Sequence, residues 1–311
     1  GKAITWMNSM NNGRPVVPRS GYIVEFNALW YNALKFAAVM EQESGNIERS
    51  NTLEELAARC KEAFVDTFLN EYGYLYDYVD GNMIDWSVRP NMIFAVALDY
   101  SPLDQKQKRG VLDVCTRELL TPKGLRSLSP KSGGYNPMYT GPQTQRDYAY
   151  HQGTAWPWLG GFYMEACLKL FKHTRLSFIE RQMVGYEDEM TNHCLGTIPE
   201  LFDGNPPFKG RGAISFAMNV AEILRTLELL EKYNFKYEYT EDNKIKLIDE
   251  DCAIYYTIEI DGEDKGIYLE KTKTYYNYFK YDFISRENER TKNLVISKEG
   301  VRVEIIFNER R

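Results

Sequence analysis

The sequence has few of the residues that build metal sites or disulfide frameworks. Its 311 residues include three histidines and five cysteines, and no histidine is spaced from a second ligand as on a zinc-binding helix. The cysteines are odd in number, scattered, form no CxxC pair and lie mostly in apolar helical patterns. This usage is typical of buried thiols in a reducing compartment. We therefore expect no metal and a cytoplasmic location.

Long apolar runs and an excess of basic residues are also lacking. No run approaches the roughly 20 apolar residues that cross a bilayer, and the N-terminus lacks the order of a signal peptide. The formal net charge is -6, so nothing favours binding to nucleic acid or to an anionic membrane. What the chain does contain is 43% hydrophobic and 14% aromatic residues, which is typical of a globular protein with a sizeable core.

Helical periodicity dominates residues 1–234. Apolar residues between 28 and 40 recur at spacings of three and four, and Thr52-Leu-Glu-Glu55 has the pattern of a capping box that opens a second helix. In all, about seven helices are predicted. The later ones cover 91–100, 104–120, 154–173, 176–194 and 213–233.

Beyond residue 234 the hydrophobic pattern changes to alternation, which predicts strands. The alternating segments are 236–239, 244–248, 253–260 and 301–307. We therefore expect a mainly α domain over 1–234 and a small β module, of unknown role, over 235–311.

Four long loops are dense in Trp, Tyr, Asn, Asp, Gly and Pro: 5–27, 72–90, 123–152 and 196–211. Long loops on a rigid scaffold often carry binding and catalysis. Aromatic faces beside carboxylates and amides suit a sugar, which offers one apolar face and a rim of hydroxyls. Glycoside hydrolysis also needs two carboxyl groups. The loop candidates are Glu25, Asp77, Asp80, Asp85, Asp147, Glu200 and Asp203.

Glu200 is the strongest candidate for a general base, because it follows Gly196-Thr-Ile-Pro199 in a loop with apolar neighbours that would exclude water. The alternative is a solvated glutamate in a turn. Trp156-Pro-Trp158 is either a helix start packed in the core or a sugar platform, and the two readings are compatible. His151 is either a hydrogen-bonded structural residue or a ligand contact.

Five segments, in order, resemble signature blocks of the amylo-α-1,6-glucosidase domain of glycogen-debranching enzymes. They span about residues 1–234 and leave the β tail uncovered. The blocks are Thr5-Trp-Met-Asn8, Val24-Glu-Phe-Asn-Ala-Leu-Trp-Tyr-Asn-Ala-Leu34, Arg89-Pro-Asn-Met-Ile-Phe-Ala-Val-Ala-Leu98, Arg146-Asp-Tyr-Ala-Tyr-His-Gln-Gly-Thr-Ala-Trp-Pro-Trp158 and Gly196-Thr-Ile-Pro-Glu-Leu-Phe-Asp-Gly204.

The resemblance implies an α/α toroid of helical hairpins that hydrolyses α-1,6-linked glucose stubs of glycogen, limit dextrin or a related branched α-glucan. It implies inversion at the anomeric carbon and no cofactor. It places the general base at Glu200. The general acid of the family is an aspartate whose position here is Asn8, and an amide has no proton to give near neutral pH.

Three explanations compete for Asn8: an engineered substitution, a natural variant whose acid is Glu25 or Asp85, or a glucan-binding domain that has lost turnover. A working member with a displaced acid is favoured, and Asn8 then still binds a sugar oxygen. A toroid relative that cleaves another linkage, such as a glucoamylase or trehalase, is a further alternative.

The same blocks suggest binding residues. Arg89 and Arg146 are planar forks suited to carboxylates or sugar hydroxyls, although Arg89 is equally suited to bracing the loops. Asp147 would accept from adjacent hydroxyls, and His151 and Gln152 would frame the terminal glucose. Stacking would come from Trp6, Trp86 and Trp156.

About seven helices are too few to close the ring that the resemblance implies. We therefore expect an incomplete toroid that lacks its first helices, with apolar faces covered by the β tail, by an absent N-terminal half or by a homo-oligomer. A well-behaved monomer in sedimentation at micromolar concentration would contradict this expectation.

Overall fold

The computed structural model describes residues 3–233 and seven strands of the C-terminal part, within 236–307. The chain divides into two compact units. One comprises Gly1–Phe171 and Phe178–Leu229, and the other comprises Lys172–Ser177 and Leu230–Arg311.

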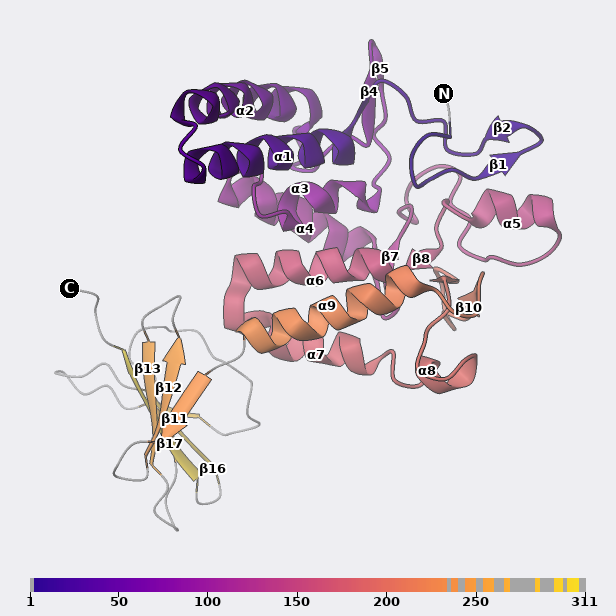
Figure 1. Cartoon of the computed structure of the whole chain (residues 1–311). Coiled ribbons are helices and arrows are strands. Elements are labelled where there is room, and N and C mark those ends of the chain that lie inside the picture. Colours follow the sequence, from indigo (N-terminus) through magenta and orange to yellow (C-terminus); the bar gives the residue numbers. More distant parts are fainter. Residues whose placement is uncertain are drawn as a thin grey trace. The chain divides into compact units, whose positions relative to one another are not determined.

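The first unit begins its helical part with a hairpin of α1 (Val24–Glu43) and α2 (Ile47–Phe68), visible in Figure 1. Tyr31, Leu34 and Ala57 form the buried cluster between them. The predicted start of the second helix was wrong. Thr52 lies inside α2, where its hydroxyl donates to the Glu48 carbonyl at 3.0 Å, because the helix already begins at residue 47.

The five remaining predicted helices match in type, although two are split. The 91–100 segment becomes a 3-10 turn, η1, that runs directly into α3, and 176–194 becomes α7 and α8. Asp104 caps α4 with a capping box to Gln107. The elements are η1 (Pro90–Ile93), α3 (Phe94–Ala97), α4 (Gln105–Glu118), α6 (Pro157–Phe171), α7 (Leu176–Val184), α8 (Glu189–Asn192) and α9 (Ala217–Tyr233).

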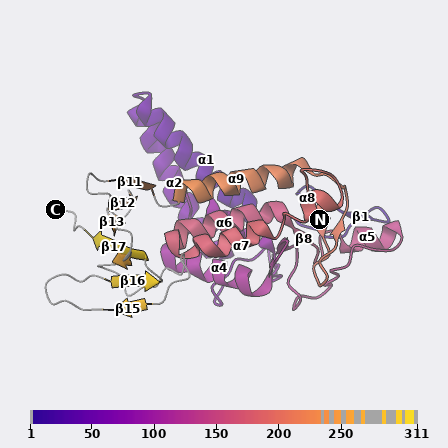
Figure 2. The same cartoon turned by 90° about the horizontal axis from the view of Figure 1, so that it is seen from below.

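Helix α6 is the most buried long helix of this unit, and α9 lies alongside it (Figure 1 and Figure 2). The Asn219 side chain accepts from the Trp158 amide at 3.1 Å and donates to the carbonyls of Pro199 and Glu200 at 2.7 and 2.8 Å. Gly161 lets α9 approach, because a Cβ there would lie 2.3 Å from a Glu222 oxygen. The start of α9 is thus tied both to α6 and to the loop that carries Glu200.

The long loops contain short elements that the periodicity did not predict. Helix α5 (Gln143–Ala149) lies in the 123–152 loop. The strands form a β1-β2 hairpin, a β3-β4-β5 sheet and a five-stranded sheet of order β10-β9-β8-β7-β6. They are β1 (Met10–Asn11), β2 (Arg14–Pro15), β3 (Tyr22–Ile23), β4 (Tyr78–Asp80), β5 (Met83–Ile84), β6 (Leu120–Thr121), β7 (Gly124–Arg126), β8 (Ala155–Trp156), β9 (Leu201–Phe202) and β10 (Gly210–Arg211).

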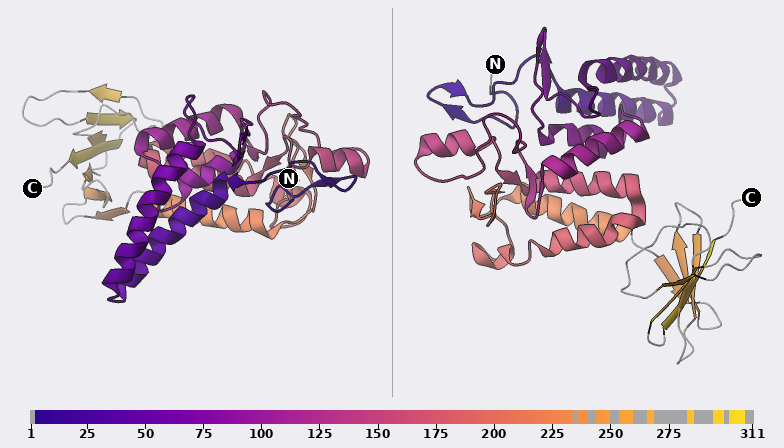
Figure 3. Two further views of the ribbon diagram at one scale, coloured as in Figure 1. Left: turned by 90° about the horizontal axis from the view of Figure 1, so that it is seen from above. Right: turned by 180° about the vertical axis from the view of Figure 1, so that it is seen from behind.

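In the second unit the described strands form one antiparallel sheet, drawn in Figure 3. Its order is β11-β12-β13-β17-β16-β14, and β15 also pairs with β16. The four predicted strand segments match β11, β12, β13 and β17. The strands are β11 (Lys236–Tyr239), β12 (Lys244–Asp249), β13 (Ile254–Glu259), β14 (Gly266–Tyr268), β15 (Phe283–Ser285), β16 (Leu294–Lys298) and β17 (Val301–Phe307). The predicted boundary at 234/235 stays a prediction.

Helix α1 exposes a stripe of large apolar side chains along one face. Trp30 is 54% exposed and Phe36 56% exposed, with Phe26, Leu29 and Met40 on the same face. Such a stripe usually packs against another element. What covers it, whether further helices or a second copy, stays a prediction.

The described part of the chain contains no helix that is long and apolar enough to span a membrane. Cys115 and Cys167 are buried and Cys60 is half-buried, as expected, but Cys194 is exposed because it lies after the short α8 rather than inside a long helix. Cys252 lies outside the described residues. The cytoplasmic location stays a prediction.

Candidate active site

Glu200 immediately precedes β9 and is half-buried, with both carboxylate oxygens accepting hydrogen bonds. The Tyr150 hydroxyl donates to Oε1, and the Ala213 amide donates to Oε2 at 2.9 Å. The Glu200 amide in turn donates to the Ala213 carbonyl at 2.9 Å. Glu200 therefore has a single defined orientation, and no guanidinium within the described residues pairs with it.

Gly212 makes this arrangement possible. Its φ of +71° lies in the left-handed region, and a Cβ at this position would lie 2.3 Å from Glu200 Oε2. Only glycine accepts both conditions without strain. The turn that presents the Ala213 amide to Glu200 thus depends on residue 212.

Tyr150 connects Glu200 to a cluster of rings, which we call the ring cluster: Trp6, Tyr150, His151, Trp156 and Trp158. The Tyr150 ring lies 4.4 Å from that of His151 and 5.1 Å from that of Trp156. Trp6 meets His151, Trp156 and Trp158 edge-on at 5.1 to 5.3 Å. Burial and the Glu200 carboxylate raise the pKa of Tyr150, so its hydroxyl remains a proton donor to Glu200.

His151 is 1% exposed and stacks on Trp156, with the ring planes 15° apart. Burial, and second the Arg89 charge, lower the pKa of His151 to about 3. Its Nδ1 has no hydrogen-bond partner within the described residues. The imidazole is therefore neutral near pH 7.

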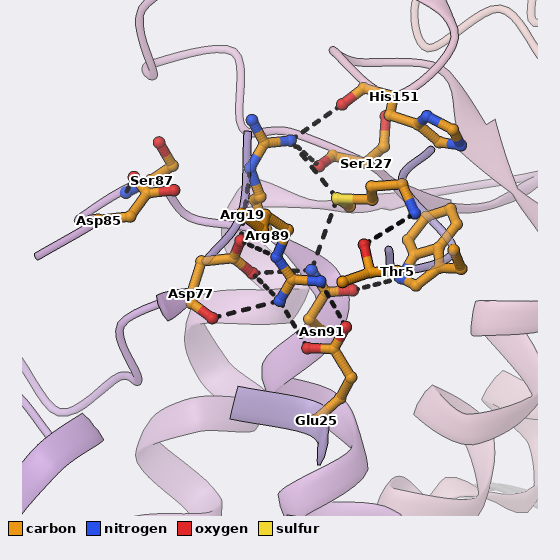
Figure 4. Close-up of polar contacts among 12 residues, drawn as sticks. Thr5, Arg19, Glu25, Asp77, Asp85, Ser87, Arg89, Asn91, Ser127 and His151 are labelled. Carbon is orange, nitrogen blue, oxygen red and sulfur yellow. Dashed lines mark hydrogen bonds and ion pairs between the residues drawn. The ribbon is translucent and has the colours of Figure 1, made fainter. Parts of the chain in front are cut away.

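A buried ionic network is joined to the ring cluster through Trp6, and its polar contacts are drawn in Figure 4. Arg19, which is 0% exposed, donates to both oxygens of Glu25, and its Nε lies 2.7 Å from Asp77 Oδ2. Asp77 Oδ1 accepts from Asn91 Nδ2 at 2.7 Å, and Asn91 Oδ1 accepts from Trp6 Nε1 at 2.7 Å. The network thereby fixes the indole of Trp6.

Arg89 extends this support to the other side of the cluster. One terminal nitrogen donates to the backbone carbonyls of Ser127 and His151 at 3.1 and 2.9 Å, and the other donates to Gln152 Oε1 at 2.7 Å. Arg89 is buried, and all of these partners are loop groups. Through these hydrogen bonds Arg89 holds the loop that carries His151 and Gln152 in place.

Asn8 is exposed, and the residues that follow it contact α5. The neighbouring Ser9 hydroxyl donates to the Asp147 carbonyl at 2.6 Å. Asp147 Oδ1 accepts from Gln143 at 2.6 Å, and Gln143 Oε1 accepts from Arg146 at 2.7 Å. Asn8, Arg146 and Asp147 therefore belong to one surface region around α5.

The other proposed acids and Trp86 lie elsewhere. Glu25 is 3% exposed and both of its oxygens accept hydrogen bonds from Arg19, which ties it to the buried network. Asp85 accepts from the Ser87 amide at 3.0 Å. Trp86 is 45% exposed and packs edge-on against Tyr76 at 4.6 Å. No described contact joins Glu25, Asp85 or Trp86 to Asn8 or Glu200.

Sequence reasoning missed the residues that hold the site together: Arg19, Asn91, Tyr150 and Gly212. Asn91 and Tyr150 lie inside the recognised segments 89–98 and 146–158, so position within a signature block was a usable signal. Arg19 and Gly212 carry no local signal, because their partners come from elsewhere in the chain.

Comparison with known proteins identifies the family. The family model described as amylo-alpha-1,6-glucosidase matches residues 1–225. The chain belongs to the amylo-alpha-1,6-glucosidase family. This confirms the resemblance stated from the sequence and makes the chain a member of a glycoside hydrolase family.

Among curated proteins, the glycogen debranching enzyme of Saccharomyces cerevisiae is 28% identical to this amylo-alpha-1,6-glucosidase family member. The match covers 52% of this chain and 13% of that enzyme. The chain therefore corresponds to a small part of this much longer relative.

Two solved structures resemble the fold. Neutral trehalase Nth1 from Saccharomyces cerevisiae matches with a TM-score of 0.52 and 16% identity, covering 68% of this chain and 38% of the trehalase. A sialidase matches with a TM-score of 0.54 and 13% identity, covering 78% of this chain and 23% of the sialidase. At such identities the likeness concerns the fold alone, and it confirms the mainly α, α/α-toroid class.

Proposed function

We propose that this chain hydrolyses α-1,6-linked glucose stubs of glycogen or a related branched α-glucan, with Glu200 as the general base of an inverting mechanism. The observation that carries the proposal is the position of the Glu200 carboxylate. Tyr150 and the Ala213 amide hold it beside the ring cluster, in which the partly exposed Trp6 and Tyr150 offer an apolar surface for a glucosyl ring. Membership of the amylo-alpha-1,6-glucosidase family supports the linkage.

In the proposed reaction, Glu200 removes a proton from water while the water oxygen bonds to the anomeric carbon from the face opposite the leaving group. The bond between that carbon and the glycosidic oxygen breaks, and the oxygen takes up a proton. The products are β-glucose and the shortened glucan. Tyr150 and the Ala213 amide each occupy one lone pair of the carboxylate, and a remaining lone pair receives the proton.

The proton for the leaving oxygen needs a source other than Asn8. Glu25 is bound to Arg19, whereas Asp147 lies beside the Asn8 segment through the Ser9 hydroxyl. Its Oδ1 is held by Gln143 and its other carboxylate oxygen has no described hydrogen bond. We assign the acid step to Asp147 in a working enzyme, with Asn8 binding a sugar oxygen.

A second candidate function is glucan binding without turnover. The observation that favours it is the amide at the family's acid position, since loss of general acid assistance commonly costs roughly a hundred- to ten-thousandfold in rate. A binding protein would keep the ring cluster and Glu200 without needing a proton donor.

The deciding experiment is glucose release from an α-1,6-glucosyl-branched oligosaccharide by the full chain, by Asn8→Asp and by Asp147→Asn. We expect release by the native chain, faster release by Asn8→Asp and a loss of at least a hundredfold in Asp147→Asn. Release by Asn8→Asp alone supports the binding function. If neither the native chain nor Asn8→Asp releases glucose, the hydrolase proposal is wrong.

A further inference from the structure

Asp203 is a fully buried carboxylate three residues after Glu200, and the proposed reaction does not use it. Its relative exposure is 0%, and both of its oxygens accept hydrogen bonds. Oδ1 accepts from the Tyr139 amide at 2.8 Å, and Oδ2 accepts from Nε and Nη2 of Arg211 at 2.9 and 2.8 Å. Hydrogen bonds to a buried carboxylate are strong and directional, so this side chain fixes its two partners relative to each other.

The Oδ2 side of Asp203 leads to one of the two hydrogen-bond donors of Glu200. Arg211 lies in β10, which pairs with β9, and the Ala213 amide that donates to Glu200 Oε2 follows two residues later. Gly212, between them, makes the left-handed turn that brings this amide to the carboxylate. The ion pair of Arg211 with Asp203 therefore holds the strand from which the turn begins.

The Oδ1 side of Asp203 leads to the other donor. The Tyr139 ring contacts that of Tyr150, with the ring centroids 5.5 Å apart, and the Tyr150 hydroxyl donates to Oε1 of the base. The residue after Asp203 adds a second tie to the same segment, because the Gly204 amide donates to the Pro137 carbonyl at 2.8 Å. The segment that carries Tyr139 is thus bound at two points to the turn that follows β9.

We propose that Asp203 is a positioning residue for Glu200, because its carboxylate holds the two segments that carry or contact both hydrogen-bond donors of the base. This inference rests on the proposed function, in which Glu200 activates water. A displacement of about 1 Å in a reacting group can cost roughly a hundredfold in rate. Asp203 acts on the rate through Tyr150 and Ala213, without touching the substrate.

The test compares Asp203→Asn with Glu165→Gln in the full chain. Each change turns a carboxylate that accepts from an arginine into an amide of the same size, and Glu165 lies on α6 with its partner Arg225 on α9. In Asp203→Asn, kcat for glucose release from the branched oligosaccharide should fall roughly 10- to 150-fold, as for loss of one charge-assisted hydrogen bond at the base, with KM changed less than about threefold. Glu165→Gln should keep the native kcat and KM.

Arg211→Met is the second variant, because the Arg211 side chain is 24% exposed and its replacement disturbs the core less than a change at residue 203. Its kcat should also fall with little change in KM, and calorimetry shows whether each variant is folded. Native kcat in a folded Asp203→Asn or Arg211→Met chain would overturn the proposal. A rise in KM alone, or an equal loss of kcat in Glu165→Gln, would overturn it as well.

The amide proton of Ala213 gives a readout that needs no turnover. In a chain labelled with ¹⁵N-alanine, its NMR signal reports the hydrogen bond to Glu200 and should move upfield in Asp203→Asn but not in Glu165→Gln, because a weaker hydrogen bond deshields the proton less. If the native chain releases no glucose but the signal moves, the hydrolase function fails while the positioning of Glu200 stands. An unmoved signal in a folded Asp203→Asn chain overturns the positioning, whether or not glucose is released.

Discussion

Replacing Arg19 with methionine should be among the most destabilising single changes in the chain. Arg19 is fully buried and compensates two carboxylates, Glu25 and Asp77, which are 3% and 2% exposed. Arg19→Met keeps much of the side-chain volume but leaves both carboxylates without their main cation. Removing one partner of a buried ion pair costs about 3–5 kcal/mol.

That cost converts into a large shift in melting temperature. A unit of this size loses about 2–4 °C per kcal/mol, so Arg19→Met should melt about 6–20 °C lower than the native chain. The matched control is Lys35→Met, which breaks a pair with Glu54 whose side chains are 25% and 43% exposed. Exposed pairs contribute about 0–1 kcal/mol, so the control should shift by at most about 4 °C.

Differential scanning calorimetry measures the melting temperatures of the two variants and of the native chain. Equal shifts in Arg19→Met and Lys35→Met would refute the view that the buried network supports this part of the fold. Arg19→Lys tests the geometry. Lysine keeps the positive charge but lacks the planar guanidinium that contacts both carboxylates. Its melting temperature should therefore lie between those of the native chain and Arg19→Met.

Three further predictions concern the candidate site. Gly212→Ala should lower glucose release and stability more than Gly196→Ala, because both glycines have φ +71° but only the Cβ at 212 meets Glu200; equal effects would contradict the close contact. Tyr150→Phe removes a charge-assisted hydrogen bond worth about 1.5–3 kcal/mol, so kcat should fall roughly 10- to 150-fold, and an unchanged kcat would exclude a positioning role. Urea unfolding at pH 7 and pH 5 tests His151, whose pKa is about 3 in the folded chain and 6.5 in the unfolded chain. Because the unfolded chain binds the proton first, the free energy of unfolding should fall as the pH drops below 6.5, by about 2 kcal/mol at pH 5. His151→Phe should remove that loss.

The sequence predicted the parts of the fold that depend on local periodicity. The helices α1, α4, α6 and α9 and four strands of the second unit follow from apolar spacing. Helix α5 escaped because its seven residues carry no apolar stripe, and the two-residue strands are too short to show alternation.

Residues of the candidate site could be predicted from the sequence where they lie within a signature segment. They could not be predicted where their position depends on contacts between distant segments. Trp6, His151 and Trp156 come together with Glu200, but Trp86 and Asp85 lie apart from them. Arg19 sits in a glycine- and proline-rich stretch that would suggest a solvated loop arginine. Its burial depends on Asp77, 58 residues away, so only the assembled fold explains it.

The central claim is that Glu200 is the catalytic base, and Glu200→Gln tests it most directly. Glutamine keeps the size and an acceptor for Tyr150 but cannot take a proton from water. We predict that glucose release from the branched oligosaccharide becomes undetectable while the dissociation constant for that oligosaccharide changes less than threefold. Retained release, or a parallel loss of release and binding, would contradict the account.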